Sequence, residues 1–199
     1  MHSKKDAILD LFFNSSKQWR FQEIKKAANI SKPQLSNWLK ILEKQNIVKR
    51  VKNKGEMPYY VQDFTSNSYE TQKRLFALNM LSGLITHLAA LPKSKVIILF
   101  GSLARSDWHG KSDIDIFIYP SDTGFKKTTY EAKLHREIQV HLAKNPAELQ
   151  HFEKILPYIL EGYFIKGSLQ ELGVEVNAKT KYSTRDTQYL SQRWIHQPS

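Results

Sequence analysis

The sequence contains no cysteine, which excludes disulfide bonds and thiolate metal sites and gives secretion no support. It also lacks an uninterrupted apolar run long enough to span a membrane. Asp6 and Asp10 interrupt the apolar residues near the N-terminus, so this segment is a poor signal-peptide core and predicts an amphipathic helix. Internal repeats and long low-complexity segments are missing too. We therefore expect a soluble, cytoplasmic protein with no membrane partner.

What the sequence does have is an excess of positive charge on a composition that can fold. Among 199 residues, 41% are hydrophobic and 12% aromatic, which is ample for a packed core. The net charge is +11 and the pI about 9.7. Residues 1–65 hold 13 lysines and arginines against 6 acidic residues, so the first third carries most of the excess. This distribution favours a nucleic-acid partner, with a generally basic protein as the alternative.

Residues 1–65 read as three helices in a row. Apolar residues recur at helical spacing over AILDLFF and again over FQEIKKAANI. The third helix, SKPQLSNWLKILEKQ, has Ser31 as its predicted N-cap, Pro33 in the first turn and Gln34 completing a capping box. Leu35, Leu39 and Leu42 form its buried stripe. The opposite face carries side chains that can contact base edges and phosphates: Lys32, Gln34, Ser36, Asn37 and Lys40.

A basic hairpin follows the third helix. Two strand-like runs, residues 47–52 and 59–62, flank a turn at 53–58 with Gly55 at its centre. Its cations could lie beside a phosphate backbone: Lys49, Arg50, Lys52 and Lys54. Over residues 4–63 this layout resembles the winged helix-turn-helix domains of archaeal and bacterial regulators, which implies a DNA partner. A winged helix can also dock a protein, and that alternative stays open. Trp38 is expected at the margin of the core rather than on a base.

The next segment, residues 66–92, predicts a long connecting helix that Pro92 closes. Apolar residues recur at helical spacing at Leu75, Leu78, Leu81, Ile85 and Leu88. This face must pack on the second domain, on the first, or on a partner chain, so a homodimer is one of the possibilities.

The second domain opens with a buried strand, VIILF, followed directly by Gly101 and Ser102 and a short helix. Glycine lets the backbone approach a phosphate, and a helix N-terminus presents free N–H groups. After a polar loop come Asp113 and Asp115, which project from the same face of a strand because they are two residues apart. Two carboxylates on one face favour a hard divalent ion such as Mg²⁺ between them. The set predicts metal-assisted nucleotidyl transfer with both aspartates catalytic.

The segments GSLAR (101–105) and SDID (112–115) together resemble the signature of nucleotidyltransferases related to DNA polymerase β, in their minimal single-domain form, over residues 95–166. The resemblance implies a small mixed sheet, an NTP donor and Mg²⁺ held by the aspartates. It also implies transfer of an NMP to a hydroxyl of a protein or RNA. The implied nucleotide-binding residues are Gly101, Ser102, Arg105 and Ser112. The whole chain is similar to archaeal winged-helix fusions that include regulators and antitoxin-like proteins, so a toxin-like partner is possible.

One departure from the family pattern concerns catalysis. The family supplies a third carboxylate from the neighbouring strand, here 137–143, and its position falls on Gln139. Glu137 is expected on the same strand face and could substitute for it, with His141 a weaker candidate. Ser106 stands where a glycine is usual. Trp108 and His109 lie in the loop over the site, where they either contact a base or pack.

The predicted fold class is α+β, with domains at 1–65 (winged helix), 66–92 (connecting helix), 93–172 (nucleotidyltransferase) and 173–199 (tail, with Trp194 docking it). A helix capped by Asn145 with Pro146 in its first turn is expected to continue as helical cover to about residue 167. Two functions compete: a DNA-binding nucleotidyltransferase, and a transcriptional regulator or antitoxin-like protein whose weakened transferase domain only binds nucleotide or a partner. A drug-modifying transferase leaves the winged helix unexplained.

Overall fold

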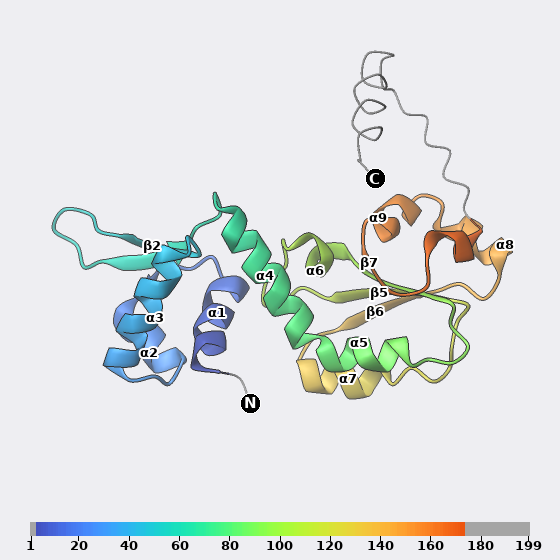
Figure 1. Cartoon of the computed structure of the whole chain (residues 1–199), viewed down its shortest axis with the longest axis horizontal. Coiled ribbons are helices and arrows are strands. Elements are labelled where there is room, and N and C mark those ends of the chain that lie inside the picture. The colour runs from blue at the N-terminus through green and yellow to red at the C-terminus, as the bar shows by residue number, and fades with distance from the viewer. Residues whose placement is uncertain (1–2, 174–199) are drawn as a thin grey trace, which may run out of the picture.

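The computed structural model describes residues 3–173, so the predicted tail, with Trp194, lies outside the described residues. The N-terminal domain contains α1 (Lys4–Asn14), β1 (Trp19–Arg20), α2 (Phe21–Ala27), α3 (Lys32–Lys44), β2 (Val48–Val51) and β3 (Tyr59–Gln62) (Figure 1). The three strands form an antiparallel sheet in the order β1-β3-β2. The predicted helices and hairpin are confirmed. The two-residue β1 was not predicted, because a strand this short leaves no alternation to recognise.

The start of α3 is capped as expected, but not by a full capping box. The Ser31 hydroxyl accepts a hydrogen bond from the Gln34 N–H at 3.5 Å. The Gln34 side chain does not complete the box, because its Oε1 accepts from the Ser31 hydroxyl at 3.0 Å. One N–H of the first turn is therefore satisfied by Ser31, and the reciprocal bond predicted from the sequence is wrong.

The connecting segment is helical, as expected, and divides at Leu81 into α4 (Asn67–Met80) and α5 (Ser82–Ala89). The buried face of α4, which includes Phe76 and Ala77, packs on both domains at once. Leu75, which was expected on this face, is 54% exposed, so the predicted apolar stripe is wrong at that position. The Phe76 ring lies 5.4 Å from Phe13 of α1 and 6.2 Å from Trp108 of the second domain. Figure 1 shows α4 running between the two domains. Of the three packing partners considered from the sequence, α4 therefore contacts both the first and the second domain.

The second domain is built on a four-stranded mixed sheet. Its strands are β4 (Val96–Phe100), β5 (Ile114–Tyr119), β6 (Ile138–Leu142) and β7 (Tyr163–Lys166), in the order β6-β5-β4-β7. β5 and β6 are parallel, and the other pairs are antiparallel. The remaining elements are α6 (Gly101–Arg105), α7 (Lys127–Leu134), α8 (Pro146–Leu149), η1 (Gln150–Phe152), α9 (Leu156–Leu160) and η2 (Leu169–Leu172). The chain is therefore α+β, as predicted.

Strand β7 corrects the sequence prediction, which continued helical cover through this segment. Gly162 ends the helical part, and a Cβ there would collide with the Leu99 carbonyl of β4. Glycine thus allows the chain to come up against β4 and pair with it over Tyr163–Lys166. A short apolar run such as Tyr163–Ile165 occurs in strands and in helices alike, so its pattern alone did not separate the two.

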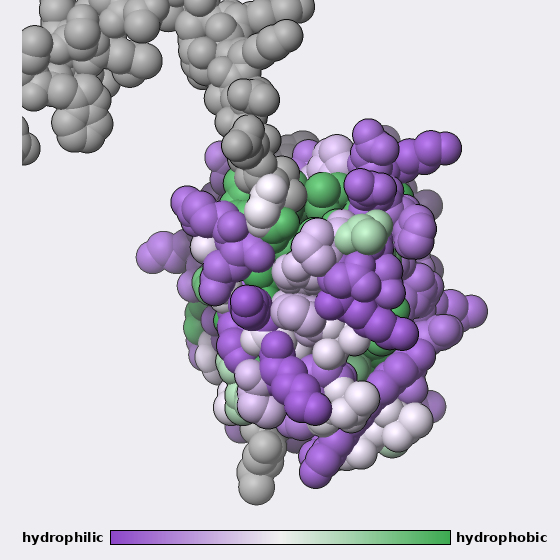
Figure 2. All heavy atoms as spheres, turned by 90° about the vertical axis from the view of Figure 1, so that its right-hand side faces the viewer, coloured by the Kyte–Doolittle hydropathy of each residue, from purple (hydrophilic) through white to green (hydrophobic). Residues whose placement is uncertain are grey.

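The two faces of the sheet have different cover. The face that carries Ile98, Phe117 and Tyr119 packs against Ile159 and Leu172 of the C-terminal segment. The other face joins a larger core that runs without interruption through α4 into the N-terminal domain. Figure 1 shows α5 and α7 on one side of the sheet and α9 on the other. Hydrophilic side chains dominate the end of this domain seen in Figure 2. No helix within residues 3–173 is long and apolar enough to cross a membrane.

Candidate functional site

Two carboxylates and a glycine meet at one end of the second sheet. Asp115 stands in register with Phe100 of β4 on one side and with Gln139 of β6 on the other. Gly101 follows Phe100 at once and has a φ of +74°, in the left-handed region that favours glycine. A Cβ at Gly101 would overlap Oδ2 of Asp115. The backbone at Gly101 therefore lies directly against this carboxylate, in a space that no larger residue could share.

The Asp115 carboxyl has an unusual titration. Its pKa is raised, first because burial removes water from the charged form, and also because the Asp113 carboxylate lies nearby. His141 and Arg105 act in the opposite direction. A negative charge on Asp115 is thus disfavoured in the protein alone and would be relieved by a bound cation.

Gln139 contacts the second carboxylate. Its Nε2 donates a hydrogen bond to Oδ2 of Asp113 at 2.7 Å. The residue opposite Asp115 on the neighbouring strand is therefore an amide that uses its N–H group on the aspartate pair. Glu137 precedes β6 and is exposed, and its backbone carbonyl accepts from the Ile114 N–H at 2.9 Å. His141 is wedged between Phe100 and Phe152, with ring centroids 5.2 and 6.3 Å away.

The other residues expected at the nucleotide are near but differently engaged. Ser102 lies in the first turn of α6 and is half-buried. The exposed Arg105 forms an ion pair with Asp107 at 3.0 Å. The Ser112 hydroxyl accepts from the His109 N–H at 2.9 Å, which closes the loop before Asp113. Ser106 has a φ of +67°, in the left-handed region that favours glycine, which explains why glycine is usual at this position in the family.

Trp108 and His109, which are adjacent in the chain, differ in their exposure to solvent. Trp108 is fully buried and its ring stacks on Phe76, so it packs and does not face a base. His109 is exposed, and its Nδ1 accepts from the Lys111 N–H at 3.2 Å. Of the two alternatives left open by the sequence, packing is right for Trp108.

The donor set suits a hard divalent cation, with one carboxylate fewer than the family provides. Asp113 and Asp115 offer oxygen ligands of the kind Mg²⁺ prefers, and nucleotide phosphates and water could complete its coordination. Residues 3–173 contain no group of three or more acidic, histidine or cysteine side chains that could hold a metal by themselves. The pair of aspartates therefore fits a cation that arrives with a phosphate ligand better than a free-standing metal site.

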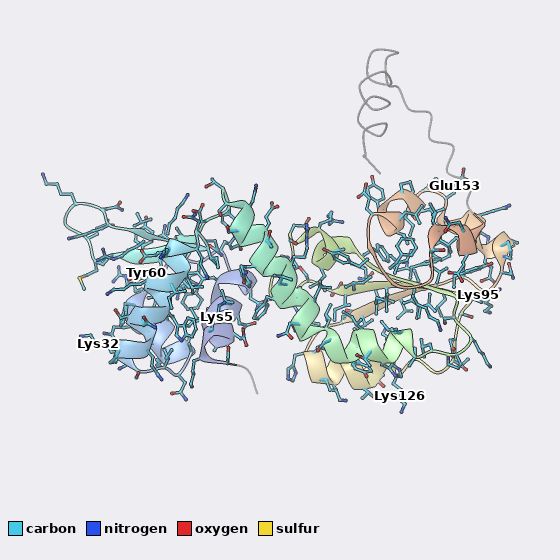
Figure 3. The ribbon with its side chains drawn as sticks, in the orientation of Figure 1. Lys5, Lys32, Tyr60, Lys95, Lys126 and Glu153 are labelled. Carbon is cyan, nitrogen blue, oxygen red and sulfur yellow. The ribbon has the colours of Figure 1, made fainter. Side chains whose placement is uncertain are left out.

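The predicted DNA-binding residues lie on two neighbouring elements. On α3, the stripe of Leu35, Leu39 and Leu42 is buried. The opposite face shows exposed Lys32, Gln34, Asn37 and Lys40, with Ser36 partly buried. Lys32, at the start of α3, lies on the side of the molecule away from the second domain (Figure 3). Trp38 is partly buried and packs on the core, as predicted.

The hairpin cations are not equivalent. Lys49 is tied back to the fold, because its Nζ forms an ion pair with the buried Asp63 at 2.7 Å and donates to Thr65 at 3.1 Å. Arg50, Lys52 and Lys54 are exposed on β2 and on the turn that follows. Gly55, with a φ of +80°, makes the turn, and the hairpin projects away from the second domain (Figure 1).

Sequence reasoning missed Arg136, which turns out to organise the loop before Asp113. The guanidinium donates to the carbonyls of His109 and Ser112 at 2.9 and 2.7 Å. It lies over the Trp108 ring, 5.2 Å from its centroid. A single arginine between a helix and a strand gives no pattern to read, so only the folded chain identifies it.

Two family models match the chain, and together they cover nearly all of the described residues. The HxlR-like helix-turn-helix model matches residues 3–82, and the polymerase beta nucleotidyltransferase model matches residues 83–169. No curated protein and no solved structure was found that matches the chain. The two matched regions meet between residues 82 and 83, in the first turn of α5. The chain thus joins an N-terminal HxlR-like helix-turn-helix domain to a C-terminal nucleotidyltransferase domain of the polymerase beta type.

Proposed function

We propose that the chain is a DNA-binding protein whose second domain binds an NTP together with Mg²⁺ and transfers its NMP to a hydroxyl of a protein or RNA. The observation that carries the proposal is the juxtaposition of Gly101 with Asp115, beside Asp113. Gly101 leaves room for the partly desolvated Asp115 carboxylate against the backbone, and this carboxylate beside Asp113 suits a metal-bound phosphate chain, which would neutralise its charge.

Each residue has a proposed task. Asp113 and Asp115 hold Mg²⁺, which neutralises charge on the transferring phosphate when bound. The backbone at Gly101 and the Ser102 hydroxyl face the triphosphate. Arg105 and Ser112 flank it, the first as a mobile cation exchanging Asp107 for phosphate, the second by shaping the loop before Asp113.

A second candidate function is favoured by Gln139. In the first candidate the attacking hydroxyl must give up its proton, and an amide has no basic group that can accept it. Gln139 also donates to Asp113 and so offers the metal no negative charge. These facts support a transcriptional regulator or antitoxin-like protein that retains nucleotide binding and has little transfer activity. Glu137 supports the second candidate too, because it lies outside β6 and is exposed to water.

One experiment separates the two candidates. The protein is incubated with NTPs labelled at the α-phosphate, Mg²⁺ and protein or RNA acceptors, and NTP binding is measured in parallel. An Asp113→Asn/Asp115→Asn variant serves as the control, and Gln139→Glu restores the missing carboxylate. Label above the control supports transfer by the natural chain. Binding without label, together with label in Gln139→Glu, supports the regulator. If the natural chain shows no Mg²⁺-dependent NTP binding, both candidate functions are contradicted.

A further inference from the structure

The side chain of Arg136 holds the loop that leads into Asp113. Arg136 donates through one nitrogen to the carbonyls of His109 and Ser112, and Ser112 is the residue directly before Asp113. A rigid guanidinium that bonds two carbonyls at once fixes the path of the chain between them. The position of Asp113 therefore depends on where Arg136 lies.

Arg136 is in turn anchored to the helix-turn-helix domain. Its second terminal nitrogen donates to Oδ1 of Asn14, the last residue of α1, at 2.8 Å. The backbone carbonyl of Asn14 accepts from the Gly110 N–H in the same loop at 3.1 Å. The loop before Asp113 is thus bonded to the end of α1 twice, once directly and once through Arg136. We call Arg136, Asn14 and the loop 109–112 the Arg136 junction.

The end of α1 is also fixed to the hairpin that carries the exposed cations. Gln62, the last residue of β3, is buried, and its Nε2 donates to the carbonyl of Phe12 at 2.7 Å and to that of Ser15. These two carbonyls flank Asn14 in the chain. A shift of β3 would therefore move the residues on both sides of Asn14. The bonds of Gln62 to α1, the backbone of residues 12–15 and the bonds of Asn14 to Arg136 and Gly110 together link the hairpin to the loop before Asp113.

The Arg136 junction is supported by aromatic rings on one side and borders a cavity on the other. Phe13, next to Asn14, lies edge-on to Trp108 at 6.3 Å, and Trp108 supports the guanidinium of Arg136. Beside the hydrogen bonds a cavity of about 440 Å³ opens between the two domains, lined by Asn14, Gly110, Lys133 and Arg136 among others. The junction is therefore tight on the aromatic side and open on the other.

We propose that the Arg136 junction couples the two sites, so that DNA held by the hairpin tightens the binding of Mg²⁺ and NTP at Asp113 and Asp115. Arg136 is a positioning residue for Asp113, and Asn14 transmits the state of the helix-turn-helix domain to it. The proposal rests on the function proposed above. DNA that immobilises β3 also immobilises the end of α1 and, through it, the loop 109–112. The loop then loses less conformational entropy when nucleotide binds, so the nucleotide binds more tightly.

The test measures NTP affinity of the full chain with Mg²⁺, with and without a mixed-sequence duplex of about 30 base pairs at low salt. We expect the duplex to tighten NTP binding by roughly fivefold or more, and NTP to tighten duplex binding by the same factor, because coupling is reciprocal. Asn14→Ala removes the bond to Arg136 and keeps the backbone bond to Gly110. In this variant we expect each ligand alone to bind as in the natural protein and the mutual enhancement to fall. The matched control is Lys133→Ala, which alters the same cavity outside the junction and should keep the enhancement.

The position of the loop is followed independently by amide hydrogen exchange at Gly110 and Ser112. The duplex alone should slow exchange at these amides in the natural chain and in Lys133→Ala, and to a smaller extent in Asn14→Ala, which keeps the bond from the Gly110 N–H to the Asn14 carbonyl. Equal NTP affinity with and without duplex, or an enhancement that Asn14→Ala leaves undiminished, overturns the coupling while leaving the proposed function intact. A natural chain that binds neither NTP nor duplex overturns the proposed function, and the coupling with it. If the natural chain binds the duplex but not NTP, the exchange measurement still tests the coupling. Amide exchange at Gly110 and Ser112 that does not change when the duplex is added overturns it.

Discussion

At the residue scale, the candidate site and the hairpin turn both use a backbone conformation that favours glycine. Gly101 and Gly55 both have positive φ, at +74° and +80°. A side chain at Gly101 would meet Asp115, whereas nothing lies within 4 Å of a Cβ at Gly55. An alanine at Gly55 would therefore add backbone strain alone, whereas an alanine at Gly101 would add the same strain and also displace the Asp115 carboxylate.

We predict that Gly55→Ala destabilises the protein by about 1–2 kcal/mol, the cost of placing a side chain in the left-handed region. Gly101→Ala should cost more than this and should also abolish Mg²⁺-dependent NTP binding, because Asp115 must move. Urea unfolding and NTP titration of both variants check the prediction. Equal losses of stability in the two variants would show that the contact with Asp115 contributes nothing.

Asp115 predicts an unusual dependence of stability on pH. Its pKa is higher in the folded protein than the ordinary 3.8, so the folded state binds more protons between the two values. Stability therefore falls as pH rises through this window. Without Mg²⁺, Asp115→Asn should be more stable than the natural protein at neutral pH, and this advantage should shrink as pH falls through the raised pKa towards 3.8.

Asp122 provides a control of opposite sign. Hydrogen bonds from the N–H groups of Gly124 and Lys93, both at 2.8 Å, lower its pKa. Its contribution to stability is present above the ordinary value and is lost as pH falls through the lowered pKa. Asp122→Asn should therefore be less stable than the natural protein at neutral pH, with a deficit that disappears in acid. Thermal unfolding across pH measures both, and the same sign for the two variants would contradict the assignment.

At the element scale, the hairpin cations fall into two groups, one paired within the fold and one exposed. Lys49 is bound to Asp63 and Thr65, whereas Lys52 and Lys54 are exposed. We predict that Lys52→Ala/Lys54→Ala weakens duplex binding and reduces the slope of log K against log salt by about 2, because roughly one counterion is released per phosphate contact. Its unfolding free energy should not change.

Lys49→Ala should show the opposite pattern, with a loss of stability and a smaller effect on the salt slope, because its ammonium is already paired. Binding titrations at several salt concentrations and urea unfolding distinguish the two cases. If Lys49→Ala lowers the salt slope as much as the double variant does, without any loss of stability, the division of roles is wrong.

At the scale of the whole molecule, the two domains share one hydrophobic core. Trp108 of the second domain is fully buried, stacks on Phe76 of α4 and lies edge-on to Phe13 of α1. We predict that the natural chain unfolds in one calorimetric transition and that Trp108→Ala, which removes about 3–5 kcal/mol of core packing, separates it into two. Trp38→Ala, at the margin of the first domain, should lower the melting temperature and keep a single transition.

How much could be predicted from the sequence depended on how local each signal was. The capping residue Ser31, the turn at Gly55, the buried stripe of α3 and the order of Gly101, Ser102, Asp113 and Asp115 are local, and all these elements lie where they were expected. Strand β7 was missed because its pairing with β4 joins residues more than 60 positions apart, and only Gly162 marks it. A cytoplasmic location, a homodimer and a toxin-like partner stay predictions.

The sequence by itself determined the two domains, their order and the positions of the candidate site residues along the chain, because capping, periodicity and short motifs act over a few neighbouring residues. Only the tertiary structure decided how those residues meet. It placed Gln139 on Asp113, buried Trp108 between the domains and brought Arg136 to Asn14, which is 122 positions away in the chain. Such contacts arise when distant segments bury their apolar faces together, and no local pattern encodes them. The connection between the hairpin and the aspartate pair is therefore a property of the folded chain alone.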